Sequence, residues 1–316
     1  MSARNVLVTG AADPIGERLV RLLLDDSRVQ RIIAISGRPT ESLALPRDER
    51  LMTVQVDLRK GRRVQELLFG PARDAAINVV VHTGVSRADT GETRHAFDVE
   101  AVRSLIELGE RHPTINRLVL RSAAEVYQRQ RDLPVLIEEE HPFNLDPNLP
   151  DWVRDRVEAD ITACARMGLS RLQITVLRMA EALAIGTGSQ LFDYLESAVC
   201  FRPAGYDPMI NVLTIEDAAI ALARATHSEA VGVFNIPGAD TLPLSACIRK
   251  WGRIGVPVPG AWMTPLYRWR RRFTGHDFRW GINRRRFIYS GVLDGGRARA
   301  ILGYVPSHPV AWPVPS

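Results

Sequence analysis

The loop "VTGAADPIG" at positions 8–16 holds the first residues that could do chemistry. An apolar run precedes it and leucines at helical spacing follow, which predicts a strand, a tight turn and a helix with Pro14 in its first turn. Gly10 and Gly16 would let the backbone approach a ligand, and the N–H groups at the start of the helix carry a partial positive charge. The pattern favours a diphosphate site over a turn that merely uses glycine.

A second candidate is the segment "PGAWMTPLYRWRRRF" at 259–273, in which aromatic residues alternate with arginines. It could be an interfacial helix that meets anionic lipid headgroups, or an anion pocket for a nucleotide-sugar diphosphate. It could equally be a helix with one buried apolar face and one solvated arginine face. No nucleic-acid-reading module accompanies it, so we expect no nucleic-acid partner.

Composition limits the class of protein. The 316 residues carry a net charge of +5, and only two of the 41 basic residues are lysines, Lys60 and Lys250. No apolar stretch reaches the length of a membrane span, and "MSARNVLVTG" enters a strand without a signal peptide. The three cysteines lack metal-ligand spacing. We expect a cytoplasmic protein without a metal, peripheral at a membrane if 259–273 binds lipid.

Strand and helix patterns alternate through the first 180 residues, and one more helix and strand follow at 215–237. The expected strands are 5–10, 31–36, 51–56, 77–84, 117–122, 172–179 and 232–237, and the expected helices are 14–26, 97–112, 151–167 and 215–225. This alternation predicts an α/β fold with a Rossmann-like, doubly wound parallel sheet. We assign 1–180 and 211–239 to this dinucleotide-binding domain, and 181–210 and 240–316 to a smaller C-terminal substrate or partner lobe.

Seven motifs occur in the order and at the distances seen in one enzyme family. They are "VTGAADPIG" (8–16), "VDL" (56–58), "VVVHTGV" (79–85), "VLRSAAEVYQ" (119–128), "VLRMAEALAIG" (176–186), "LTIEDAAIALARA" (213–225) and "LDGGRARAILGYVP" (293–306). Together they resemble the extended short-chain dehydrogenase/reductase family, the NAD-dependent epimerase/dehydratase group. The resemblance implies an oxidoreductase or epimerase that binds NAD(P) and acts on a hydroxyl of a nucleotide sugar or a lipid-like alcohol.

The resemblance also implies the cofactor-binding residues. They are Gly10, Asp13, Pro14, Ile15 and Gly16 at the diphosphate, Asp57 and Leu58 at the adenine, Thr83, Gly84 and Val85 beside the cofactor, and Arg156 at the ribose. The second strand ends in "SGRP" (36–39), without an acidic residue for an adenine-ribose hydroxyl. Arg38 could instead meet a 2′-phosphate, so we expect NADP(H) rather than NAD(H).

The chain departs from the family at the residues that transfer protons. The tyrosine and lysine positions hold Trp152 and Arg156, and the serine position holds Ala123. No tyrosine lies between 128 and 178 and no lysine between 61 and 249, so the pair is absent rather than displaced. Ser122 and Tyr127 are the remaining candidates for proton transfer.

Two further departures affect binding. Asp13 replaces the middle glycine of the phosphate loop, and a carboxylate there repels a diphosphate unless a cation intervenes. Glu181 stands where the family has asparagine.

Two classes of function follow. The first is an enzyme with altered proton transfer that acts on a small-molecule substrate. The second is a pseudoenzyme that serves as a cofactor sensor, scaffold or membrane-surface partner, in which Trp152 is free to fill the pocket above the nicotinamide. The resemblance places a homodimer contact on helices 97–112 and 151–167.

Overall fold

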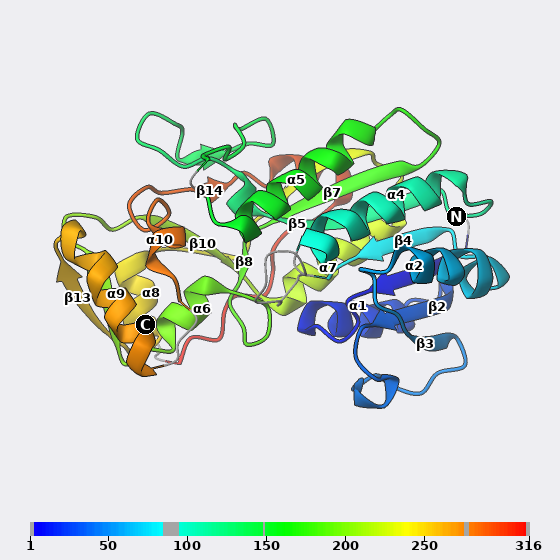
Figure 1. Cartoon of the computed structure of the whole chain (residues 1–316), viewed down its shortest axis with the longest axis horizontal. Coiled ribbons are helices and arrows are strands. Elements are labelled where there is room, and N and C mark those ends of the chain that lie inside the picture. The colour runs from blue at the N-terminus through cyan, green and yellow to red at the C-terminus, as the bar shows by residue number, and fades with distance from the viewer. Residues whose placement is uncertain (1–2, 85–94, 148, 275–277, 314–316) are drawn as a thin grey trace.

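A computed structural model describes residues 3–84, 95–147, 149–274 and 278–313 (Figure 1). Val85, predicted beside the cofactor, lies outside these residues.

The centre of the molecule is a seven-stranded sheet in the order β11-β7-β5-β4-β1-β2-β3, and every neighbouring pair is parallel. The strands are β1 (Arg4–Thr9), β2 (Val29–Ser36), β3 (Leu51–Gln55), β4 (Val79–His82), β5 (Arg117–Ala123), β7 (Gln173–Met179) and β11 (Gly232–Ile236). The predicted Rossmann-like parallel sheet is confirmed. The order reverses between β1 and β4, and ligands of such sheets bind outside the carboxyl ends of the strands at this point.

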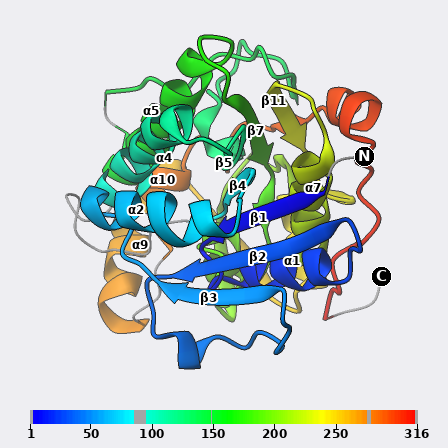
Figure 2. The same ribbon diagram turned by 90° about the vertical axis from the view of Figure 1, so that its right-hand side faces the viewer.

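Helices cover both faces of the sheet (Figure 2). One face carries α1 (Pro14–Leu24) and α7 (Ile215–His227), and the other carries α2 (Gly61–Leu67), α4 (Ala101–Arg111) and α5 (Asp151–Arg166). Strand β1 shows why its sequence is apolar throughout: Val6 and Val8 join one core cluster, and Leu7 joins the other. Successive side chains of a strand point to opposite faces, so both sets must be apolar.

The rest of the chain forms smaller sheets and short helices, at the left of Figure 1 for the most part. A three-stranded sheet contains β12 (Asp240–Pro243), β10 (Met209–Leu213) and β8 (Glu181–Ala182). Two strand pairs join β13 (Ile254–Val258) to β9 (Val199–Pro203) and β14 (Val292–Leu293) to β6 (Leu136–Ile137). The helices here are α6 (Gln190–Leu195), α8 (Leu244–Lys250), α9 (Gly260–Thr274) and α10 (Trp280–Asn283). Single helical turns occupy Thr40–Ser42, Leu68–Ala72, Ala96–Glu100, Ala124–Val126 and Ala298–Leu302.

A third core cluster, rich in aromatic rings, holds these elements together. The rings of Tyr194 and Phe287 pack at a tilt with centroids 4.9 Å apart, and the rings of Tyr267 and Phe278 have the same centroid distance. This cluster draws on residues from both 181–210 and 240–316. The division of the chain into two domains stays a prediction.

Helix α9 contains most of the arginine-rich segment and is amphipathic. Met263 and Tyr267 are buried, whereas Trp262 and Trp269 are 66% and 62% exposed. Among the described residues, no helix combines the length and apolar character needed to cross a bilayer.

Candidate functional site

The phosphate loop packs directly against the end of β4. Gly10 has a φ of +72°, and a Cβ there would lie 2.8 Å from the Cα of Gly84. A Cβ at Gly16 would lie 2.2 Å from the carbonyl oxygen of Gly10. Thr83 fixes the contact from the other side, because its hydroxyl donates to the carbonyl of Thr9 at 2.7 Å. Glycine is therefore required at both positions by the fold itself.

A hollow of about 240 Å³ opens at this loop. Its walls are Asp13, Pro14, Ile15, Arg121, Gly186, Thr187 and Gly188. Helix α1 begins here, so its N-terminal partial charge faces the hollow. Asp13 brings a negative charge, and Arg121 brings a positive charge from β5. These residues fit a diphosphate, because the cation that Asp13 requires is present in the same hollow.

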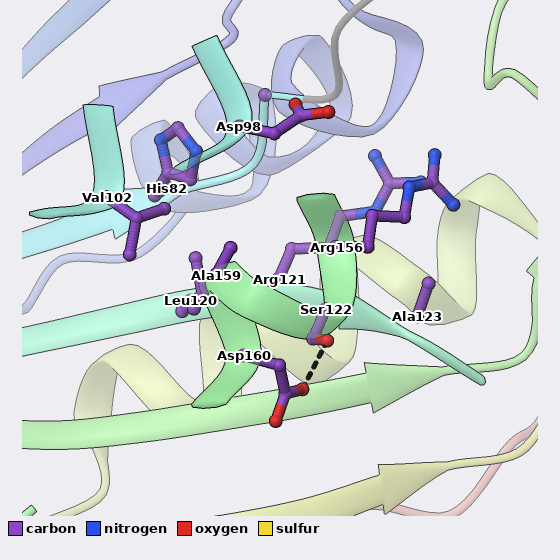
Figure 3. A pocket seen from close by; sticks show the side chains of 11 residues that line it. His82, Asp98, Val102, Leu120, Arg121, Ser122, Ala123, Arg156, Ala159 and Asp160 are labelled. Atoms are coloured by element: carbon purple, nitrogen blue, oxygen red, sulfur yellow. Dashed lines mark hydrogen bonds between the residues drawn. The ribbon is translucent and has the colours of Figure 1, made fainter. Parts of the chain in front are cut away.

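A larger hollow of about 470 Å³ lies at the carboxyl ends of β4 and β5 (Figure 3). Its walls are His82, Gly84, Asp98, Val102, Leu120, Arg121, Ser122, Ala123, Arg156, Ala159 and Asp160. Arg121 lines both hollows and donates to the carbonyl of Thr83 at 3.2 Å. One guanidinium thus connects the phosphate loop to the strand ends.

His82 is a core residue at the edge of this hollow. Its exposed fraction is 2%, and its Nδ1 lies 2.7 Å from the hydroxyl of Thr9. Burial, assisted by the charge of Arg121, lowers the pKa of His82 to about 4. The ring is therefore neutral near pH 7, as expected for a histidine at the core edge.

Ser122 lies in the wall of this hollow beside Asp160. Its hydroxyl donates to the carboxylate of Asp160 (Figure 3). Asp160 is fully buried and forms an ion pair with Arg178 at 2.6 Å. The serine proton is thus directed to a carboxylate whose charge is already paired.

Tyr127 belongs to the same buried network. Its hydroxyl donates to Oδ1 of Asn235 at 2.7 Å and accepts from Nη1 of Arg178 at 3.0 Å. The residue is 1% exposed, and burial raises the pKa of its hydroxyl to about 12. This geometry favours a structural part for Tyr127, and the proton transfer predicted for Tyr127 and Ser122 stays a prediction.

Trp152 and Arg156 form a stacked pair on α5. The guanidinium carbon of Arg156 lies 4.7 Å from the centroid of a Trp152 ring, and its Nη1 lies 3.7 Å from Oε2 of Glu125. Arg156 and Ala123 line the larger hollow, and the place of Arg156 at the ribose stays a prediction. Trp152 is not among the lining residues, so the indole does not fill this hollow.

The residues expected at the adenine lie near the ends of β2 and β3. The carboxylate of Asp57 accepts from Arg59 at 2.8 Å, and this hydrogen bond lowers the pKa of Asp57. Leu58 is buried. Arg38 is exposed, and its backbone N–H donates to the Ser36 hydroxyl at 2.9 Å.

Three charged wall residues of the larger hollow were not expected from the sequence: Arg121, Asp98 and Asp160. Arg121 could have been singled out in the sequence, because this charged residue directly follows the apolar run "LVL" (118–120) of a predicted strand. Within the described part of the chain, no group of three or more His, Cys, Asp or Glu side chains is placed to hold a metal ion.

The sequence model of the NAD dependent epimerase/dehydratase family matches residues 6–150, which confirms the resemblance drawn from the motifs. "Uncharacterized protein Rv0501" of Mycobacterium tuberculosis is 29% identical over 314 residues, covering 95% of this chain and 80% of the relative. A dTDP-glucose 4,6-dehydratase from Bacillus anthracis, solved in complex with NAD, has a TM-score of 0.70 at 20% identity, covering 97% of this chain and 92% of the other. A UDP-glucose 4-epimerase from Thermotoga maritima, solved with UDP-glucose, has a TM-score of 0.70 at 15% identity, with coverages of 96% and 94%.

Proposed function

We propose that the protein binds a nicotinamide dinucleotide in the two hollows that share Arg121 but has lost or altered the standard tyrosine–lysine proton transfer. The match of residues 6–150 to the sequence model of the NAD dependent epimerase/dehydratase family supports dinucleotide binding. A bound nicotinamide would exchange a hydride with a hydroxyl-bearing substrate, a nucleotide sugar or a lipid-like alcohol.

One observation carries the proposal: the larger hollow has a volume of about 470 Å³ and two arginines in its wall, and no tyrosine or lysine is among its described wall residues. Arg121 supports diphosphate binding beside Asp13, and Arg156 supports ribose binding. The indole of Trp152 is a donor with no useful acidity, so it cannot take the place of a tyrosine. The wall thus favours binding over rapid proton transfer.

NADP(H) is favoured over NAD(H) by Arg38. Its guanidinium is exposed beyond the end of β2, where a 2′-phosphate of the adenine ribose would lie. Asp57 does not compete for it, because its carboxylate is paired with Arg59.

The second candidate is a pseudoenzyme that works at a membrane surface. It is favoured by the exposed rings of Trp262 and Trp269 on α9, beside the exposed Arg268. Aromatic rings and arginines on one helix suit the boundary of anionic lipid. Co-sedimentation with phosphatidylserine vesicles, lost in a Trp262→Ser, Trp269→Ser variant, is the result expected from this candidate.

A homodimer contact through α4 and α5 also remains a proposal. The two helices lie side by side on one face of the sheet (Figure 2). Ile161 on α5 is 39% exposed. Sedimentation of wild type and Ile161→Glu would show a dimer that the variant weakens.

Calorimetric titration with NADPH and NADH tests the main proposal. We expect one site per chain, with NADPH bound more tightly and with Arg38→Ala removing that preference. Absence of heat and of any thermal stabilisation with both nucleotides would rule out dinucleotide binding. Steady turnover of a family substrate at ordinary enzyme rates would contradict the loss of standard catalysis.

A further inference from the structure

A third hollow lies on the other side of the Trp152–Arg156 pair. Its empty space is about 460 Å³, part of it open to solvent, which is within the usual range for a small-molecule site. Its walls are Glu125, Tyr127, Arg129, Asn144, Leu149, Trp152, Val153, Asn283, Arg285 and Arg286. Arg156 lines the larger hollow and Trp152 lines this third hollow, so the stacked pair lies between the two.

The charged groups around this third hollow are mostly paired with each other. Arg286 binds Glu181 and lies 3.9 Å from Glu125, and Arg285 binds Asp146. Burial opposes the charge of Glu181, but Arg286 keeps the pKa of Glu181 below its ordinary value. Of the three arginines in the described wall, one takes part in none of these ion pairs.

That cation is Arg129. Among the described residues, no carboxylate lies within 4.0 Å of its guanidinium and no acceptor forms a hydrogen bond with it. Burial lowers the pKa of Arg129 to about 10, so it remains charged near pH 7. A mostly enclosed guanidinium without an acceptor is costly, and an anion would stabilise it.

The fold makes room for this side chain. A Cβ at Gly291 would lie 2.8 Å from Nε of Arg129 and 3.0 Å from its guanidinium carbon. Only glycine at 291 therefore permits the guanidinium to occupy its present position. The absence of a side chain at position 291 thus leaves the space that the guanidinium occupies.

Three more polar atoms at this hollow lack partners. Nη1 of Arg285, Nε of Arg286 and Oδ1 of Asn144 are buried, and none of them has a hydrogen-bond partner among the described residues. Buried polar groups of this kind are usually satisfied by water or a ligand. Leu149, Trp152 and Val153 contribute apolar side chains to the wall of the same hollow.

We propose that this third hollow binds the oxyanion group of a small ligand at Arg129, with the planar or apolar body of the ligand against Trp152, Leu149 and Val153. Carboxylate and phosphate ester share the required chemistry, since each offers paired oxygens to a guanidinium. The assignment of this ligand as the substrate rests on the proposed function, whereas binding itself does not require the dinucleotide.

Calorimetry with four probes tests the site: benzoate, its neutral isostere benzamide, phenyl phosphate and inorganic phosphate. We expect benzoate to bind roughly 10-fold or more tightly than benzamide, because a hydrogen bond to a charged group contributes that much. The better of benzoate and phenyl phosphate identifies the head group. Inorganic phosphate should bind more weakly than phenyl phosphate, because it cannot use the apolar wall, and equal affinity would contradict that part of the proposal.

Variants assign the binding to Arg129. Arg129→Met should remove the advantage of benzoate over benzamide, Arg129→Lys should keep part of it, and Gly291→Ala should weaken it by displacing the guanidinium. Arg131→Met is the matched control, because Arg131 is exposed in the same loop and is not part of the wall. Equal binding by wild type and Arg129→Met, or no preference for anionic probes, would overturn the inference.

The same variants separate this inference from the proposed function. Arg129 does not line the cofactor hollows, so Arg129→Met should bind NADPH as wild type does. In the wild-type protein, NADPH binding without probe binding would refute the oxyanion site alone. Probe binding without NADPH binding would refute the dinucleotide proposal alone.

Discussion

Tyr127→Phe separates a structural tyrosine from a catalytic one. The substitution keeps the ring, which packs in the core beside His141, and removes only the hydroxyl. Oδ1 of Asn235, a fully buried residue, then loses its donor. Arg178 keeps its other partners, Asp160 and the carbonyl of Glu139. The loss is therefore two hydrogen bonds, and one buried acceptor, Oδ1 of Asn235, is left unpaired.

The expected loss of stability follows from that count. A buried polar group left without a partner costs about 1–3 kcal/mol. Unfolding a chain of 316 residues has an entropy of roughly 660 cal/mol/K, on the usual scaling with chain length. The melting temperature should then fall by roughly 1.5–4.5 °C.

Differential scanning calorimetry of wild type and Tyr127→Phe gives this shift, and NADPH titration of the same samples gives the binding. We expect the variant to melt earlier and to bind NADPH as tightly as wild type. A variant with unchanged melting that loses turnover on any identified substrate would refute the structural interpretation and make Tyr127 the proton donor.

Three other substitutions test separate parts of the site. Asp13→Gly should tighten NADPH binding by about tenfold, because it removes a carboxylate beside the diphosphate; weaker binding in calorimetry would contradict this. His82 has a folded pKa of about 4, below its unfolded value, so its contribution is complete above about pH 6.5 and is lost as the pH falls towards 4. Urea unfolding across this window should show a steeper loss of stability in wild type than in His82→Asn, and parallel curves would contradict it. Asp160→Asn should cost about 3–5 kcal/mol of unfolding free energy, because it leaves Arg178 buried without its counterion. The double variant with Arg178→Met should recover part of that loss, and strictly additive losses would argue against the ion pair.

The parallel sheet could be predicted because its strands are buried on both faces and its helices carry one apolar stripe. These patterns are local in sequence, and the observed bounds of β2, β3 and α5 differ from the predicted ones by no more than two residues at either end. The phosphate loop was predictable for a similar reason, since Gly10, Pro14 and Gly16 follow directly on the first strand.

The polar networks could not be predicted, because their members are far apart in the chain. Tyr127 meets Asn235 across 108 positions, and Glu181 meets Arg286 across 105. Nothing in the sequence near Tyr127 indicates whether its hydroxyl faces a cofactor or a buried amide. Arg129 is similar, because its place depends on the absence of a side chain at Gly291.

A crystal structure of the protein grown with NADPH tests the central claim most directly. The account predicts a diphosphate between the N-terminus of α1 and Arg121, with the nicotinamide ribose beside Arg156 and no tyrosine or lysine in contact with the nicotinamide. A cleft that stays empty at saturating NADPH would contradict dinucleotide binding. Tyr127 turned out of its network towards the nicotinamide would contradict the loss of the standard acid.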